Sequence, residues 1–286
     1  MVSAACVLLA LLIVAAMPPD TTAGPCTMIR EMAMLRGVPE ASGLALSRKH
    51  PDVIWTHNDS GNDSMLFAVD TLGEPRGQVR VPFRTRDWED LSAGPCPPVD
   101  GAQGATGDCL YIADIGDNDV VRRNVQVLRV PEPEPEAART ARPEVFTLTY
   151  PDGPHNAEAM FVVDGVVFVV TKDRSGVLYR STTPLREPGP VPMRRVRELG
   201  IVRVTDAEAS RDGASIVIRT VDEAIVYRTA DLLDGRAAPA IARVALGRLR
   251  EPQGEGVALD GDVLYLASES AVWSRAGRLL SLRCAF

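Results

Sequence analysis

The chain has very few lysines and histidines. Its 286 residues include two lysines, Lys49 and Lys172, and three histidines, while Asp and Glu number 38 against 31 Lys and Arg. Nucleic-acid binding needs clustered basic residues that neutralise phosphates, so the acidic balance argues against a nucleic-acid partner. The scarcity of histidine also makes a zinc site unattractive, because zinc prefers nitrogen and sulfur ligands.

The motifs of several common active sites are missing too. The sequence contains no Gly-x-Ser-x-Gly, no Gly-rich loop followed by Lys-Ser/Thr, and no His-Glu-x-x-His. These motifs are typical of serine hydrolases, P-loop NTPases and zinc proteases. Any chemistry of this chain must therefore come from other groups.

The apolar stretch at the N-terminus, residues 7–16, is shorter than the roughly 20 residues that a membrane span needs. Small residues follow at 21–23, as they do before a secretory cleavage site. We therefore expect residues 1–23 to be a signal peptide and 24–286 to be an extracellular domain without a membrane span. A retained N-terminal membrane anchor is the alternative. Cleavage would change the net charge from −7 to −6, because residues 1–23 contain one charged residue, Asp20.

A short acidic phrase recurs five times, each time at the start of an apolar run. Its anchor residues are Ser42, Glu89, Glu158, Glu208 and Glu255, spaced by 47, 69, 50 and 47 residues. Three of these spacings match the roughly 40–50 residues of a propeller blade. Three further apolar runs, separated by turn residues, follow each anchor, so each unit supplies four antiparallel strands. We predict an all-β fold, a single β-propeller of five four-stranded blades, with six blades or an open β-sandwich as alternatives.

The long interval contains two insertions rich in Pro and Gly, residues 94–108 and 131–143. Both are expected to hang from one rim of the propeller, together with residues 184–192. Residues 27–35 read as an additional strand that pairs with the last blade, closing the ring and protecting an edge. The last blade itself is expected to contain outer strands at 263–267, 271–274 and 279–284.

The cysteine count fits export. Cys6 lies in the expected signal peptide, and four cysteines remain, an even number as expected in an oxidising compartment. Four cysteines allow three pairings, of which the blade geometry favours Cys26–Cys284 and Cys96–Cys109. Free buried thiols are the alternative.

The acidic phrases place carboxylates at one mouth of the central channel. The innermost strand of each blade lines the channel, and its first residues share one face, here called the top face, with the connections between second and third strands. So many carboxylates at close range must raise their pKa values or bind a cation, and oxygen ligands on turn-rich backbone suit Ca²⁺. The candidate metal ligands are Glu89, Asp114, Asp117, Glu158, Asp206, Glu208, Glu255 and Glu269. Glu40, Asp59, Asp87 and Asp222 belong to the same group of top-face acids. Alternatively, these carboxylates accept hydrogen bonds from backbone N–H groups and fix the spacing of the blades.

Other polar residues at the top face are candidates for ligand contacts. We expect Asn58, Asn118, Lys172 and Arg219 to contact a small-molecule or phosphorylated ligand there. The candidate catalytic residues are His57, His155 and Lys172. We expect Trp88 to pack between blades and the protein to be a monomer.

Five short motifs lie at these positions: residues 40–45, 55–61, 87–91, 114–118 and 254–258. In these motifs the chain resembles secreted bacterial β-propeller proteins of the phytase-like (esterase-like phytase) type, over most of residues 38–286. In propeller phytases an acidic top face holds several Ca²⁺ ions, which bind substrate phosphates and activate water. The resemblance implies that Lys172 and Arg219 contact phosphate. It also implies four metal ligands: Glu89, Glu158, Glu208 and Glu255.

Two functions fit these observations. The first is a metal-dependent hydrolase of phosphate esters or other esters, with Ca²⁺ at the top face. The alternative is a non-catalytic extracellular ligand-binding or scaffold propeller that uses the same face.

Overall fold

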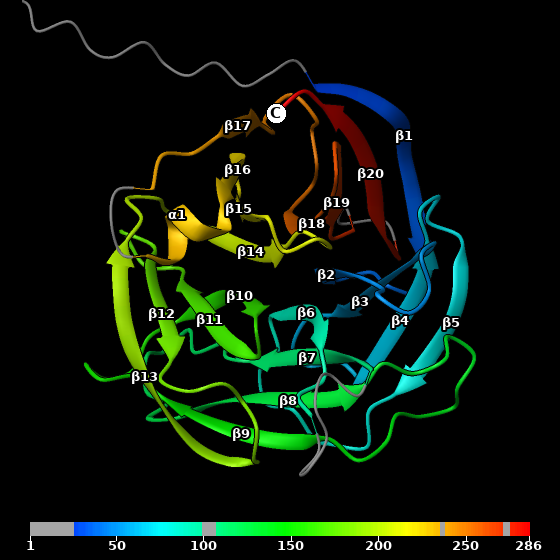
Figure 1. Cartoon of the computed structure of the whole chain (residues 1–286). Helices are drawn as coiled ribbons and strands as arrows, with labels where there is room; N and C mark the ends of the chain where they lie inside the picture. The colour runs from blue at the N-terminus through cyan, green and yellow to red at the C-terminus, as the bar shows by residue number, and fades with distance from the viewer. Residues whose placement is uncertain (1–25, 99–106, 235–237, 271–274) are drawn as a thin grey trace, which may run out of the picture.

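The computed structural model describes residues 26–98, 107–234, 238–270 and 275–286. Its strands form four-stranded antiparallel units arranged around a central axis (Figure 1). The β-propeller fold predicted from the repeat is thereby confirmed. The expected signal peptide, residues 1–23, lies outside the described residues. In the described part of the chain, no helix has the length and apolar character needed to span a bilayer.

Each unit of four strands is called a blade here, and its strands run outward from the channel. Blade 1 contains β2 (Ala41–Leu46), β3 (Val53–Asn58), β4 (Met65–Asp70) and β5 (Pro75–Arg80). Blade 2 contains β6 (Asp90–Pro95), β7 (Asp108–Asp114), β8 (Val125–Pro131) and β9 (Glu144–Thr149). Blade 3 contains β10 (Ala157–Val163), β11 (Val166–Thr171), β12 (Val177–Ser181) and β13 (Gly189–Glu198).

Blade 4 contains β14 (Val204–Ala209), β15 (Ser215–Thr220), β16 (Glu223–Arg228) and β17 (Ala242–Ala245), with the short helix α1 (Thr229–Leu233) after β16. Blade 5 contains β18 (Gly254–Asp260), β19 (Val263–Ser268) and β20 (Ala276–Cys284), and its outer strand is β1 (Cys26–Arg36).

The two ends of the chain meet in blade 5, as Figure 1 shows for β1 and β20. The pairing of the N-terminal strand with the last blade was predicted, but its place in the blade was not. β20 pairs directly with β19, so β1 is the fourth strand of the blade and not an addition to four. The strand expected at 271–274 lies outside the described residues.

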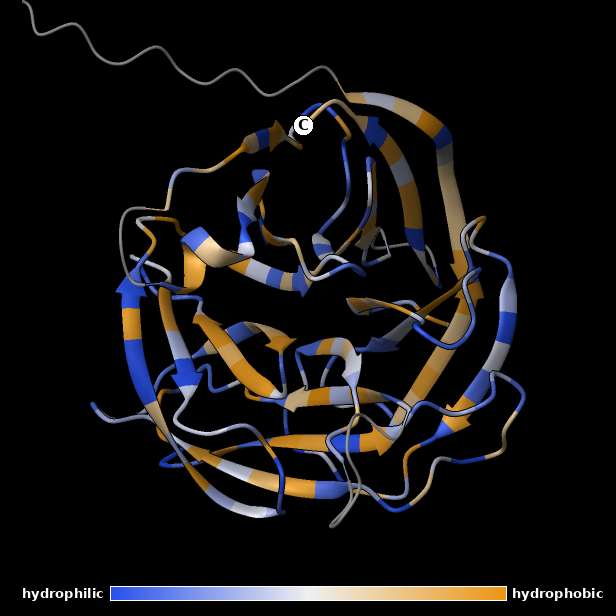
Figure 2. Ribbon diagram, viewed as in Figure 1, coloured by the Kyte–Doolittle hydropathy of each residue, from blue (hydrophilic) through white to orange (hydrophobic). Residues whose placement is uncertain are grey.

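Apolar side chains fill the spaces between neighbouring blades. Five buried clusters are found among the described residues, one at each blade-to-blade contact. Trp88 belongs to the cluster between blades 1 and 2 and is 1% exposed, as expected. Hydrophobic residues dominate middle strands such as β4 and β11, whereas outer strands such as β5 are more hydrophilic (Figure 2). Burial of these apolar clusters holds neighbouring blades together.

Both predicted disulfides are present. Cys26 pairs with Cys284 and joins the facing ends of β1 and β20, and Cys96 pairs with Cys109 beside the β6–β7 hairpin. Disulfides of this kind persist in oxidising compartments. The first one closes nearly the whole chain into a covalent ring.

The outer strands make two contacts that the sequence did not predict. β9 and β13 pair in parallel, with Gly189 opposite Phe146, and so join blades 2 and 3 into one eight-stranded sheet. The insertion at 131–143 reaches back to blade 1, where the N–H of Thr140 donates to the main-chain oxygen of Arg80 (2.9 Å) and the N–H of Arg80 donates to that of Ala138 (3.2 Å). Both contacts cover strand edges that would otherwise be open to pairing.

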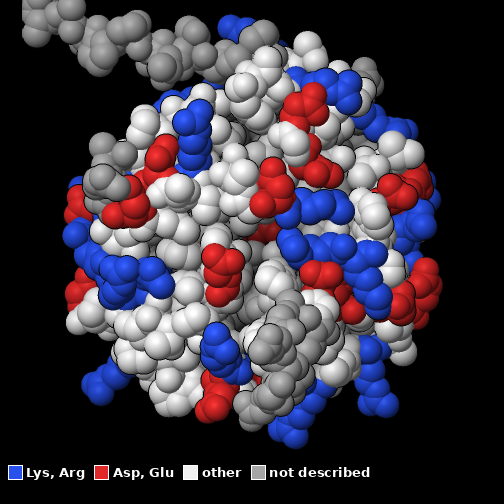
Figure 3. Space-filling model, in the orientation of Figure 1, with Lys and Arg blue, Asp and Glu red and all other residues white. Residues whose placement is uncertain are grey.

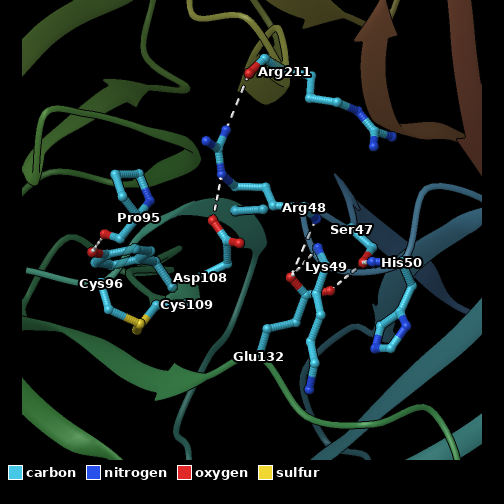
Figure 4. Close-up of polar contacts among 12 residues, drawn as sticks. Ser47, Arg48, Lys49, His50, Pro95, Cys96, Asp108, Cys109, Glu132 and Arg211 are labelled. Atoms are coloured by element: carbon cyan, nitrogen blue, oxygen red, sulfur yellow. Dashed lines mark hydrogen bonds and ion pairs between the residues drawn. A yellow bond between two sulfur atoms is a disulfide. The ribbon is translucent and has the colours of Figure 1, made fainter. Parts of the chain in front are cut away.

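The connections on the face opposite the acids, the bottom face, are tied together by side chains. Glu132 accepts hydrogen bonds from the Ser47 hydroxyl and the Trp55 indole N–H (2.9 Å). Arg48 lies between the Asp108 carboxylate (2.8 Å) and the main-chain oxygen of Arg211 (3.1 Å), as Figure 4 shows. Over the face seen in Figure 3, basic and acidic side chains are interspersed.

Candidate functional site

Nine acids at the top end of the channel form two layers that differ in their hydrogen-bond partners. Three lie inside the channel and are called the channel carboxylates: Asp90, Asp206 and Glu208. Six lie around its opening and are called the mouth carboxylates: Asp59, Asp87, Glu89, Glu158, Glu255 and Glu269. Each channel carboxylate accepts a backbone N–H group from another blade.

Asp90 and Asp206 connect the innermost strands of all five blades. Asp90 on β6 accepts the N–H of Met160 on β10 (2.6 Å), and Asp206 on β14 accepts those of Leu44 on β2 (3.2 Å) and Val257 on β18. The two carboxyls also hydrogen-bond each other, and complete burial raises both pKa values, that of Asp90 well above its ordinary range. Burial therefore favours the protonated form at this pair, more strongly for Asp90 than for Asp206.

Glu208 and Arg219 also connect blades: Glu208 on β14 joins blade 4 to blade 2, and Arg219 on β15 joins blade 4 to blade 5. The Glu208 carboxylate accepts the Ser92 hydroxyl (2.6 Å) and the N–H of Ala93 (3.2 Å). Arg219, which is 0% exposed, donates to the main-chain oxygen of Gly256 (2.7 Å) and pairs with Glu251 (2.6 Å). Glu208 was expected to bind a metal and Arg219 to contact a ligand. The structure places both side chains in the interior, where they bind other residues of the protein.

The mouth carboxylates Asp59, Asp87 and Glu89 converge from two blades. One oxygen from each lies within 4.8 Å of the other two. Among the described residues, no hydrogen-bond donor reaches the carboxylate of Asp87 or Glu89. Burial, with Glu158 as the next cause, raises the pKa of Glu89 to about 10. Carboxylates at such close range without a donor can be stabilised by a bound cation or by a donor from a ligand.

Gly116 forms the wall of this cluster. A β-carbon at this position would overlap an oxygen of Glu89 and one of Asp87. The N–H of Gly116 donates to the main-chain oxygen of Asp87 (3.0 Å), which holds the loop in place. The absence of a side chain here is therefore required for the carboxylates to lie as they do.

Lys172 is the lysine at the mouth, and its ammonium group forms an ion pair with Glu158. Burial raises the pKa of Glu158 to about 7, with Lys172 acting in the opposite direction. Burial and the charge of Glu255 likewise raise the pKa of Glu269 to about 7. The amide of Gln253 bridges Glu255 and Glu269, at 2.9 Å from each. Glu158 and Glu269, with pKa values of about 7, therefore titrate near neutral pH, where a proton acceptor is most useful.

Asp114 and Asp117 do not join the mouth cluster. The Asp114 carboxylate accepts the backbone N–H groups of Arg86 (2.9 Å) and Asp87 (3.0 Å) and pairs with the Arg122 guanidinium (3.0 Å). Asp117 accepts the backbone N–H of Arg122 (2.7 Å). Both were expected as metal ligands, and they instead order the loop that presents Gly116.

The two candidate catalytic histidines have partners other than the mouth carboxylates. His57 is completely buried, stacks on Trp88 and donates from Nδ1 to the Asn58 carbonyl, and burial lowers its pKa to about 4. His155 hydrogen-bonds Asp152 (3.0 Å) and Tyr179 (3.0 Å) between blades 2 and 3.

The two asparagines expected to bind a ligand have partners within the protein. Asn58 accepts the N–H of Glu40 (3.0 Å), and Asn118 accepts the amide of Asn156 (3.1 Å). Asp59 and Asp87 were predicted to be top-face acids but not metal ligands. Gly116 was missed altogether, although its place in a Gly-containing acidic loop was a signal.

No family model matches the chain, and no curated protein matches it. Solved structures do share its fold. The PQQ-bound aldose sugar dehydrogenase from Streptomyces coelicolor aligns with a TM-score of 0.50 at 13% identity, over 92% of this chain and 98% of that one. A glucose dehydrogenase gives 0.52 at 10%, over 90% and 100%. The Malassezia sympodialis allergen Mala s 1 gives 0.56 at 9%, over 89% and 96%. At such identities the likeness is one of β-propeller-like fold.

Proposed function

We propose that the protein binds Ca²⁺ through its mouth carboxylates and hydrolyses a phosphate ester or another ester at that site. The observation that carries the proposal is the cluster of Asp59, Asp87 and Glu89; the last two carboxylates receive no hydrogen bond from the residues that the structure describes. The two disulfides suit an oxidising compartment, so we place this activity outside the cell.

The donor set fits calcium. Ca²⁺ takes six to eight oxygen ligands at about 2.3–2.6 Å, so two oxygens on opposite sides of one ion are about 5 Å apart. The three carboxylate oxygens lie within 4.8 Å of one another. Glu89 is buried but Asp59 and Asp87 are half-buried, which leaves coordination positions for water and for an oxygen of the substrate. A bound Ca²⁺ would polarise the scissile group and favour water as the attacking group.

The residues around the cluster supply the remaining functions. Glu158 and Glu269, with pKa values near 7, are suited to accept the proton of an attacking water. Lys172 is 36% exposed and can donate to an anionic oxygen of the substrate. His57 and His155 take no part, because both are held by other partners.

The likeness to a PQQ-bound dehydrogenase does not favour a second function. PQQ carries several carboxylates, and its binding calls for cationic partners. The mouth offers Lys172, which already pairs with Glu158, among six carboxylates. Its chemistry therefore suits a cation better than a polyanionic quinone.

Hydrolysis of p-nitrophenyl phosphate and p-nitrophenyl acetate, each with excess Ca²⁺ and with EDTA, tests the proposal. We expect turnover of at least one ester that needs Ca²⁺ and falls at least a hundredfold in Asp87→Asn/Glu89→Gln. The charge-matched variant Glu136→Gln/Glu187→Gln, on exposed bottom-face loops, should keep full activity. Calcium binding without turnover of any ester would instead support a ligand-binding propeller.

A further inference from the structure

A groove lies on the outer side of the mouth, at the top of blade 1. It has a volume of about 640 Å³ and is formed by the β3–β4 connection and the segment after β5. Ser60 and Arg86 line it, and each is next in sequence to a carboxylate of the mouth cluster, Asp59 and Asp87. The groove therefore borders the acidic cluster without containing any of its carboxylates.

The groove is rich in hydrogen-bond donors. Its lining includes Ser60, Ser64, Arg80, Arg84, Thr85 and Arg86. The hydroxyls of Ser64 and Thr85 lie 3.3 Å apart. The acid that lines it, Asp63, is 3.5 Å from the Arg80 guanidinium. After that pair is set aside, Arg84 and Arg86 give the groove a charge of about +2 at neutral pH.

These two arginines differ from the other arginines near the channel. Arg48, Arg122 and Arg219 all have carboxylate or carbonyl partners. The side chains of Arg84 and Arg86 make no hydrogen bond or ion pair with any described residue. Each guanidinium thus keeps five N–H donors for a ligand, in the fork geometry that suits phosphate and carboxylate oxygens.

We propose that this groove is an anion-binding site that takes a phosphoryl group. A phosphoryl dianion matches the two unpaired guanidinium charges, and its three terminal oxygens accept more hydrogen bonds than the two of a carboxylate. The serine and threonine hydroxyls supply further donors. The site goes beyond the proposed hydrolytic centre and needs no metal ion, because Arg84 and Arg86 bear the positive charge themselves.

Calorimetric titration of the full chain with inorganic phosphate in EDTA tests the groove apart from the calcium site. We expect one phosphate per chain, bound at least tenfold more weakly by Arg84→Gln/Arg86→Gln. Arg84→Lys/Arg86→Lys keeps the charge but not the fork, so its loss should be smaller. The control Arg142→Gln/Arg228→Gln changes two exposed arginines outside the groove, removes the same net charge and should bind as the wild type does.

Three results would overturn the assignment. Equal affinities of the wild type and Arg84→Gln/Arg86→Gln would show that the groove is not the site. An equal loss in the control would show that only net charge matters. Displacement of phosphate by equimolar acetate would show that the groove does not select a phosphoryl group. Loss of phosphate binding in EDTA leaves the calcium proposal intact, and loss of calcium binding leaves the groove intact.

Discussion

Replacing Asp206 with alanine tests whether the channel carboxylates hold the blades together. The substitution removes the acceptor of two buried backbone N–H groups, those of Leu44 and Val257, which belong to blades 1 and 5. An unsatisfied buried donor costs about 1–3 kcal/mol, so we expect a loss of about 2–6 kcal/mol in the free energy of unfolding. That is a large part of the roughly 5–15 kcal/mol that stabilises a typical protein.

Guanidinium unfolding monitored by circular dichroism and tryptophan fluorescence measures this loss directly. The midpoint of thermal unfolding should fall by on the order of 10 °C. Asp206→Asn is the matched control. Its carbonyl oxygen can still accept the two N–H groups, so it should lose less than half as much stability. The reasoning is refuted if Asp206→Ala loses less than about 1 kcal/mol, the cost of one such donor, or if both variants lose equally.

The buried carboxyls of Asp90 and Asp206 should also make the stability of the protein depend on pH. Burial raises the pKa of both carboxyls, that of Asp206 to about 7, while unfolded aspartate titrates near about 3.9. The folded state then binds more protons between these values, so the contribution of the pair is complete below about pH 4 and is lost as the pH rises towards 7. In calcium-free solution, Asp206→Asn should therefore show a shallower fall of stability over this range.

Three further predictions follow from the fold and the mouth. Opening the Cys26–Cys284 disulfide by double substitution to serine should lower stability by about 5 kcal/mol, because its loop is the longer of the two; a loss no larger than that of the hairpin disulfide in denaturant unfolding would contradict this. Gly116→Ala should weaken Ca²⁺ binding at least tenfold in calorimetry, since its β-carbon would overlap the Glu89 carboxylate; unchanged affinity would remove the glycine from the site. Stabilisation by Ca²⁺ in thermal unfolding should be greater at pH 8 than at pH 5, because the ligand Glu89, whose pKa is raised to about 10, must lose its proton to bind the ion; a pH-independent shift would exclude Glu89 as a ligand.

Much of the fold could be predicted because its signals are local. The recurring anchors, the apolar runs between them and the turn residues specify one blade at a time. The closure by residues 27–35 and both disulfides followed from placing those blades in a ring. The pairing of β9 with β13 could not be predicted, because it joins outer strands of different blades and leaves no period in the sequence.

The roles of the acids were harder to predict, since a role depends on donors far away in sequence. Asp90 and Met160 are 70 residues apart, and Asp206 and Leu44 are 162 apart. Nothing local distinguishes Glu208, which accepts the Ser92 hydroxyl, from Glu89, whose carboxylate has no donor within the described part of the chain. The hydrogen bonds of the channel carboxylates fit the interpretation as spacers, whereas metal binding by the mouth carboxylates stays a prediction.

The arginine groove was missed for a related reason. The sequence shows few lysines and no run of basic residues, so no basic patch was expected. The alternation Arg84-Thr85-Arg86 directly before Asp87 was a signal, because alternate residues of an extended segment point to the same side. Only the fold brings this segment beside the β3–β4 connection.

Calcium titration by isothermal calorimetry, on the wild type and two variants, tests the central claim most directly. The account predicts specific binding by the wild type, loss of binding in Asp87→Asn/Glu89→Gln, and affinity within about threefold of the wild type in Glu208→Gln. The last variant changes a channel carboxylate whose partners are Ser92 and Ala93. Loss of binding in Glu208→Gln with full binding in Asp87→Asn/Glu89→Gln would contradict the division into two layers, and no binding by the wild type would refute the calcium site.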